Sequence, residues 1–306
     1  MPSLKTIRKR ISSVKSTQKI TRAMKMVAGA RLTRAQQRIV ALRPYAVKTS
    51  EILTSVAASA VADKEDKDAS IDVVETPLHP LLVRRPEKKV LYVVLSSDRG
   101  LCGAFNATIS KAAEREWKRQ EAEGATVTFA TIGKKAREYL QRRKGTVDHD
   151  FLRMMEGLEL GRVKVVSEWL VSRYKKGEYD AIYLIYNEFK SAITQTLRVE
   201  PLLPLRAPEK PTEKNAAPSS TEFEFEPNRE QLLDSLVPMY IDITIYRALL
   251  ESQASEFGAR MSAMDAATRN AKDMIGRLTL VYNRARQAGI TKELMEIVGG
   301  AEALKD

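Results

Sequence analysis

Residues 4–42 read LKTIRKRISSVKSTQKITRAMKMVAGARLTRAQQRIVAL, and their apolar or small positions recur in steps of three and four. The repeat begins at Leu4 and can be followed to Ala60. A repeat of about 3.5 residues sustained this far is typical of a helix that supercoils around a partner helix. We therefore expect one long N-terminal coiled-coil helix, capped by Ser3 and kinked at Pro44.

Three polar residues interrupt this seam, namely Gln18, Thr21 and Lys25. A polar residue at a seam position can fix the register of a coiled coil. Alternatively, the helix does not pack against its own partner helix alone at this level. The residues themselves leave both interpretations open.

A second helical seam occupies the end of the chain, from about residue 228 to residue 300. Asn228 is a candidate N-cap with Gln231 three residues later, and Pro238 is expected to break or bend the first turns. Two seams of similar length at opposite ends of the chain predict one antiparallel intramolecular coiled coil. The second seam consists of Met239, Ile243, Tyr246, Leu250, Ala254, Phe257, Met261, Met264, Thr268, Ala271, Ile275, Leu278, Tyr282 and Ala285.

Between the two helices the hydrophobic pattern changes to that of strands. Residues 90–95 are apolar throughout and rich in valine, which is typical of a strand buried on both faces. Strands that alternate with helices predict a small α/β domain. We expect strands at 90–95, 126–132, 181–186 and 192–199, and helices at 104–122, 134–143 and 160–175.

Composition divides the chain further. Mixed charge with several prolines indicates a linker, and a stretch rich in Pro, Ala, Ser, Lys and Glu indicates a flexible loop. The predicted segments are an N-terminal coiled-coil helix at 1–61, a linker at 62–87, the α/β domain at 88–206, the flexible loop at 207–227, and a C-terminal coiled-coil helix at 228–306.

Positive charge is concentrated at the N-terminus. Residues 1–60 hold 13 Lys and Arg and one acid, Glu51, which accounts for the whole net charge of +12. Such a localised basic surface predicts an acidic protein partner, a nucleic acid or an anionic lipid surface. Tyr45 is the only aromatic residue in the basic helix, so an acidic protein is favoured over a basic coiled coil that binds nucleic acid.

The sequence offers little for catalysis, cofactors or metals. Cys102 is a lone cysteine, and the two histidines, His79 and His149, lie far apart without a pattern of carboxylates. The turn at residues 96–103 carries glycines between a strand and a helix, but it matches neither GxGxxG nor GxxxxGK[ST]. We interpret it as a tight turn, and a phosphate-binding enzyme remains the less favoured alternative.

Three motifs in order resemble the γ subunit of F-type ATP synthases, across essentially the whole chain. SSVKSTQKITRAMKMVA at residues 12–28 resembles its N-terminal helix, and SDRGLCG at 97–103 its central-domain turn. ITKELMEIVGGA at 290–301 resembles its C-terminal signature, Ile-Thr-x-Glu-x-x-Glu-x-x-x-Gly-Ala. The resemblance implies a coiled-coil shaft with a Rossmann-like α/β domain, which transmits torque and does no bond chemistry.

The same resemblance implies partners and contact residues. The shaft would be a single copy among α, β and ε subunits and a membrane ring of c subunits, with no cofactor or nucleic acid. Positions that match β contacts in the family are Met24, Arg286, Gln287, Thr291, Glu293 and Glu296, and weaker matches to a c-ring contact are Phe225 and Glu226.

Location is an expectation of the same kind. The chain shows no secretory leader, no transit peptide, no inserted cysteine pair and no run of 18 apolar residues. These features favour a bacterial protein that reaches the cytoplasmic face of the inner membrane only through its partners. Near Gln18, Thr21 and Lys25, and at the C-terminal tip, we expect the helices to face the partner ring as well as each other.

Overall fold

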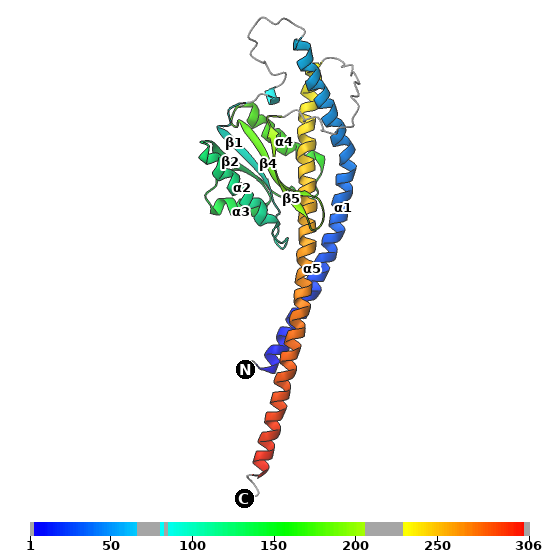
Figure 1. Cartoon of the computed structure of the whole chain (residues 1–306), viewed down its shortest axis with the longest axis vertical. Helices are drawn as coiled ribbons and strands as arrows, with labels where there is room; N and C mark the ends of the chain where they lie inside the picture. Colours follow the sequence, from blue (N-terminus) through cyan, green and yellow to red (C-terminus); the bar gives the residue numbers. More distant parts are fainter. Residues whose placement is uncertain (1–2, 66–79, 83–84, 206–228, 303–306) are drawn as a thin grey trace. The chain divides into compact units, whose positions relative to one another are not determined.

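The computed structural model describes residues 3–65, 80–82, 85–205 and 229–302. The chain divides into two compact units, one formed by Met1–Ala30 with Arg260–Asp306 and the other by Arg31–Ala259. Two long helices, α1 (Leu4–Glu65) and α5 (Arg229–Glu302), each contribute to both units (Figure 1). The expected combination of long terminal helices and a central α/β domain is confirmed.

Both predicted seams are confirmed by burial. On α1 every predicted position from Ile7 to Thr49 is buried or half-buried, and on α5 the same holds from Ile243 to Ala285. Leu4 and Met239, at the starts of the two patterns, are more than one-third exposed. The α1 seam beyond Thr49 lies outside the residues whose side chains are described.

Neither interior proline ends its helix. α1 is helical on both sides of Pro44, and α5 is helical on both sides of Pro238. Of the two outcomes expected at Pro238, a break or a bend, the break is wrong. A proline removes one backbone hydrogen bond, and Val237 and Ile241, both fully buried in the core, hold the helix on either side of it. The candidate cap Asn228 lies outside the described residues.

The central domain is built on a five-stranded sheet in the order β3-β2-β1-β4-β5. Strands β1 to β4 are parallel, and β5 pairs antiparallel with β4 at the edge. The strands are β1 (Lys89–Leu95), β2 (Thr126–Ile132), β3 (Val147–Phe151), β4 (Ala181–Phe189) and β5 (Gln195–Leu203).

Helices cover both faces of this sheet, as a parallel sheet requires. Successive β1 residues point to opposite faces, and all of β1 from Val90 onward is buried. Val90, Tyr92 and Val94 pack against α2 (Phe105–Ala122) and α3 (Lys134–Arg142). Leu91, Val93 and Leu95 pack against α4 (Leu160–Lys175) and the α5 segment of the same unit (Figure 1).

The sequence missed one strand and misplaced another. β3 was not predicted because it alternates Asp148 and Asp150 with a histidine, which gives it the polarity of a loop. β5 begins three residues later than expected because residues 191–194 form the turn that connects it to β4. The predicted loop 207–227 and most of the linker 62–87, with His79, lie outside the described residues, and the five-segment division stays a prediction.

Candidate functional site

The unit formed by the start of α1 and the end of α5 is an antiparallel helix pair. Side-chain hydrogen bonds between described residues join the two helices at several levels. As the residue number of the α1 partner rises, that of the α5 partner falls, which is the order of an antiparallel pair. These bonds join Arg8 with Tyr282 at 2.8 Å, Thr21 with Thr268 at 2.8 Å, and Lys25 with Asp265 at 2.6 Å.

These contacts explain the polar interruption of the seam. Thr21 is only 9% exposed, and its hydroxyl is within hydrogen-bond distance of the Thr268 hydroxyl. Lys25 donates to Asp265, and this bond holds the pKa of the Asp265 carboxyl below its ordinary value. Because α5 bonds Thr21 and Lys25, these two of the three polar residues support the interpretation in which polar seam positions fix the register.

The described part of α1 does not cover the last turns of α5. Arg8, in the first turns of α1, contacts Tyr282, and every α5 residue from Ile290 to Gly300 is exposed. Five of these are large apolar residues with exposed fractions of 49% to 69%. Ile290, Leu294 and Ile297 follow one another at helical spacing, so they share one face. A contiguous exposed apolar face of this kind marks an interaction surface.

The predicted contact residues that the structure describes gather around this apolar tip, with Met24 as the exception. Arg286, Gln287, Thr291, Glu293 and Glu296 are all exposed on α5, from just before the tip to its last turns. The Thr291 hydroxyl donates to the Gln287 carbonyl at 3.0 Å, and Lys292 pairs with Glu296 at 3.5 Å.

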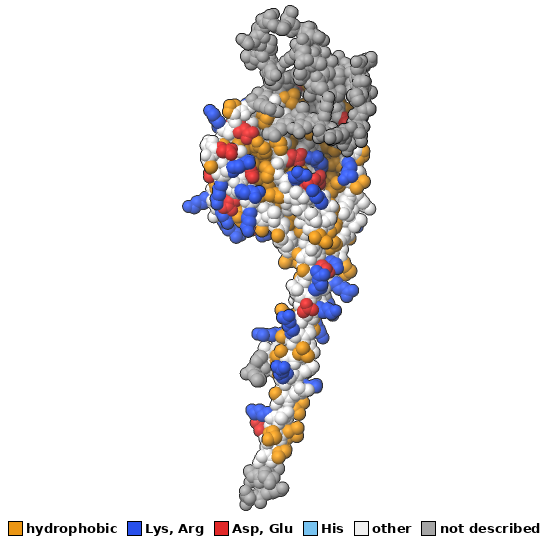
Figure 2. Space-filling view, viewed as in Figure 1, with side chains coloured by type: hydrophobic (Ala, Val, Ile, Leu, Met, Phe, Trp, Pro, Cys, Tyr) orange, Lys and Arg blue, Asp and Glu red, His pale blue; other side chains and the backbone are white. Residues whose placement is uncertain are grey.

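Met24 lies apart from that group, on α1, where it is half-buried between the exposed Arg22 and the paired Lys25. Phe225 and Glu226 lie outside the described residues. The helix pair is strongly basic, because α1 has eight Lys and Arg and no acid between residues 3 and 30. Figure 2 shows Lys and Arg side chains along the helix pair.

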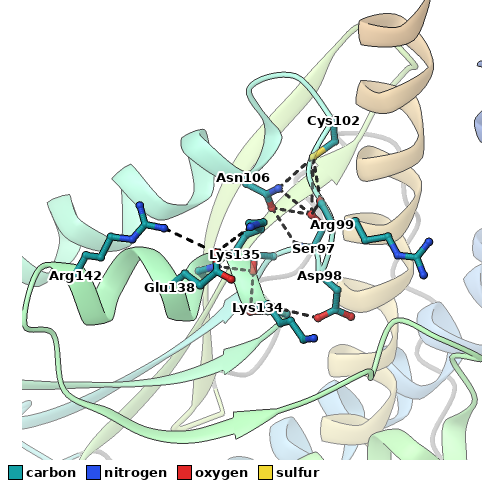
Figure 3. Close-up of polar contacts among 12 residues, drawn as sticks. Ser97, Asp98, Arg99, Cys102, Asn106, Lys134, Lys135, Glu138 and Arg142 are labelled. Atoms are coloured by element: carbon teal, nitrogen blue, oxygen red, sulfur yellow. Dashed lines mark hydrogen bonds and ion pairs between the residues drawn. The ribbon is translucent and has the colours of Figure 1, made fainter. Parts of the chain in front are cut away.

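The glycine-bearing turn after β1 is closed by its own side chains (Figure 3). The Ser97 amide donates to Asn106 Oδ1 at 3.0 Å, and Asn106 Nδ2 donates to the buried Cys102 sulfur at 3.1 Å. Asp98 accepts from the backbone amide of Lys134 at 3.2 Å. Since these groups bond one another, the geometry favours the tight turn over a phosphate loop.

A close backbone approach occurs beside this turn, at Gly133. A Cβ added to Gly100 would meet nothing within 4 Å. Gly133, at the end of β2, has φ +98°, and an added Cβ would lie 2.2 Å from the Ser96 carbonyl oxygen. The backbones of two strand ends therefore meet at Gly133, which only glycine permits.

Helix α5 crosses the carboxyl ends of β1 and β4. The Ser255 hydroxyl donates to the Asn187 carbonyl at 2.9 Å, and Ser252 approaches the Leu95 carbonyl at 3.5 Å. Both serines are fully buried. The strand order reverses between β1 and β4, and doubly wound sheets bind their ligands outside this point. In this chain a helix of the same polypeptide occupies that position.

Sequence reasoning missed the polar contacts of α5 with the sheet, because the two segments are far apart in the chain. One signal was present: polar residues interrupt the apolar pattern at 251–253 and 255–256. Four of these, Ser252, Gln253, Ser255 and Glu256, are buried.

None of the helices in the described ranges has a stretch apolar enough to cross a bilayer.

Comparison with known proteins shows the family of the chain. The family described as ATP synthase matches residues 3–304. The ATP synthase gamma chain of Sorangium cellulosum is 56% identical, and that of Geobacter metallireducens is 46% identical, each over 100% of both chains.

Solved structures agree on the fold. The structure of the Euglena gracilis mitochondrial ATP synthase with OSCP, F1 and the c-ring, in rotational state 3, matches 98% of this chain and 94% of its own with a TM-score of 0.62 at 19% identity. The central stalk and c-ring structure from Tetrahymena thermophila matches 81% of this chain and 99% of its own, with a TM-score of 0.57 at 24% identity. The full-length match to curated relatives carries the assignment: the chain belongs to the ATP synthase gamma chain family.

Proposed function

We propose that this chain is the central rotor shaft of a proton-translocating F-type ATP synthase and transmits torque between a membrane c ring and three catalytic β subunits. The observation that carries this proposal is the exposed apolar tip of α5 from Ile290 to Val298, beyond the described start of α1. In a family whose members are rotor subunits, such a tip is suited to turn inside a ring of other subunits. The chain itself carries out no bond chemistry.

The partners follow from the same assignment. We place one copy of the chain with α, β and ε subunits above the c ring, on the cytoplasmic face of a bacterial inner membrane, which it reaches only through these partners. The basic helix pair suits acidic loops on the β subunits, because complementary charge steers and orients partners. Phe225 and Glu226 are proposed to contact the c ring.

The contact residues have distinct proposed roles. Exposed Gln287 and Thr291 lie one turn apart next to the apolar face, where they can exchange hydrogen bonds with β as the shaft turns. Glu293 and Glu296 also lie one turn apart. Arg286 and Met24, the latter on α1, extend the contact along the helix pair.

Photocrosslinking tests the moving contact. We would assemble the complex with Gln287→Cys in a Cys102→Ser background and label the new thiol with a photoactivatable maleimide. Illumination is expected to join this chain to a β subunit and to reduce ATP turnover by about tenfold or more, because a shaft fixed to one β subunit cannot rotate.

A matched control carries the same label on the central domain. Lys111→Cys lies on the exposed face of α2, and its labelled form is expected to keep turnover after illumination. Full turnover by the Gln287→Cys complex, with the crosslink to β demonstrated on a gel, would show that this contact does not move during catalysis.

A further inference from the structure

A cluster of charged side chains lies between α5 and the strands β4 and β5. Arg247 donates to Glu200 at 2.5 Å, and the buried Tyr186 hydroxyl donates to the other Glu200 oxygen at 2.6 Å. Arg198 donates to Glu188 at 2.8 Å. Each guanidinium in the cluster therefore already has a carboxylate.

Glu251 is the carboxylate that remains. It lies one turn after Arg247 on α5, and no hydrogen bond or ion pair joins it to any described residue. Its Oε2 atom is buried without a partner, and so is the Nε atom of Arg247. A buried carboxylate without a donor is costly when it is charged, so this position favours the protonated form.

Charge balance in the cluster leads to the same conclusion. Two guanidinium groups, Arg198 and Arg247, face three carboxyl groups, so the cluster is neutral only when one carboxyl is protonated. Burial raises the pKa of Glu251 to about 7; Glu188 and Glu200 add to the rise, and Arg247 and Arg198 oppose it. The pKa of Tyr186 is also raised by burial and by Glu200, so the phenol remains a donor.

We propose that Glu251 is a positioning residue that locks α5 onto β4 and β5 when it is protonated and loosens this contact when it is ionised. Ionised Glu251 competes with Glu200 for Arg247 and repels Glu188 across the joint. Protonated Glu251 leaves the bond between Arg247 and Glu200 undisturbed. The proposal goes beyond the rotor function and concerns the joint that holds a long helix to the central domain.

The direction of the pH effect follows from linkage. The pKa of Glu251 is higher in the folded chain than its ordinary value of 4.5, so the folded joint binds the proton more tightly than the opened one. The stabilisation of the joint by protonated Glu251 is complete below the ordinary pKa and is lost as the pH rises through about 7. Between about pH 6 and about pH 8, the equilibrium constant for local opening is expected to rise about tenfold.

Hydrogen exchange on the full-length chain measures this opening. After correction for intrinsic chemical rates, we expect residues 243–256 of α5 to exchange about tenfold faster at the higher pH. Helix α2, on the other face of the sheet, serves as the internal reference. If the α5 segment keeps the same protection relative to α2 at both pH values, the lock does not exist.

Two variants assign the effect. Glu251→Gln cannot ionise and is expected to abolish the tenfold change, whereas Glu121→Gln, at an exposed position on α2, is expected to retain it. A tenfold change that survives in Glu251→Gln would overturn the assignment to Glu251. If this variant does not fold, the wild-type measurement alone still decides whether the joint opens with pH. The crosslink at Gln287 tests the rotor function separately, so either idea can fail without the other.

Discussion

Gly258 and Gly276 lie in the same helix but have different surroundings. A Cβ at Gly258 would lie 3.2 Å from Ala192 Cα and 3.3 Å from its carbonyl oxygen, at the turn between β4 and β5. A Cβ at Gly276 would meet nothing within 4 Å. Crowding therefore favours glycine at position 258. At position 276 no described residue lies close enough to favour it.

This difference predicts opposite effects of alanine. Gly276→Ala is expected to stabilise the chain by up to about 1 kcal/mol through helix propensity. Gly258→Ala gains the same propensity, but crowding against backbone atoms is expected to cost about 1–3 kcal/mol. Urea unfolding of the two full-length variants, measured side by side, checks the order. Equal stability of both variants would mean that the turn yields to the added methyl group.

At single positions the sequence predicted burial better than it predicted bonding. The apolar seam positions of α1 and α5 were correct because burial follows helical period, which is local in sequence. The bond between Thr21 and Thr268 spans 247 residues, and no local pattern names such a partner. The bond between Arg247 and Glu200 and the close approach of Gly133 to Ser96 also join residues that are distant in sequence, so no local pattern predicts them.

At the scale of elements, the hydrogen bond between Thr21 and Thr268 is expected to couple α1 to α5. Valine keeps the shape of threonine, so Thr21→Val or Thr268→Val alone removes the bond between the helices and is expected to cost about 1 kcal/mol, while the remaining hydroxyl keeps its bond to a carbonyl of its own helix. The double variant removes both hydroxyls and is expected to cost less than the sum of the two. A double-mutant cycle from thermal unfolding measures the coupling.

Thr279→Val on the exposed face of α5 is the control for helix propensity, and its effect is expected to be small. Additive losses in the cycle would show that the two hydroxyls do not interact in solution.

Element prediction succeeded where a strand carries apolar or β-branched residues at nearly every position. β1 and β4 carry runs of Val, Ile, Leu and Tyr, β2 combines Thr with Val, Phe, Ala and Ile, and all three were found. β3 was not found, because at the edge of the sheet its Asp148 and Asp150 bond Arg173 and Arg137 instead of entering the core. Pairing with β2, which is a tertiary contact, is what makes this polar segment a strand.

At the scale of the whole molecule, the apolar tip of α5 should matter for the assembly and not for the fold. Leu294 and Ile297 are 57% and 69% exposed in the chain alone. Changing both to Gln is therefore expected to alter the free energy of unfolding by no more than about 0.5 kcal/mol. In the assembled complex, the same change is expected to lower ATP-driven proton pumping several-fold, because a buried apolar contact with the surrounding subunits is lost.

Val165→Gln on α4 removes an equally exposed apolar side chain from the central domain and is expected to leave pumping unchanged. Pumping at the wild-type rate by the Leu294 and Ile297 variant would place the contact elsewhere on the chain.

Family membership and helical architecture could be predicted from the sequence because the motifs and the spacing of apolar residues are local features of it. The proposed contacts with other subunits could not be derived from the residues alone. No pattern in the sequence indicates what exposed side chains such as those of Gln287 and Glu293 contact, because their roles depend on the surfaces of other proteins.

Helix α5 lies across the ends of β1 and β4, so the same chain fills the position at which related sheets bind a ligand. In related folds this position takes a diffusible ligand, whose occupancy depends on its supply. Here Ser252 and Ser255 belong to the occupant, and the tether fixes its effective concentration, so the position remains filled at any concentration of small molecules in the cell. A position suited to a diffusible ligand thereby holds a tethered helix, and how tightly that helix is held is a property of folding.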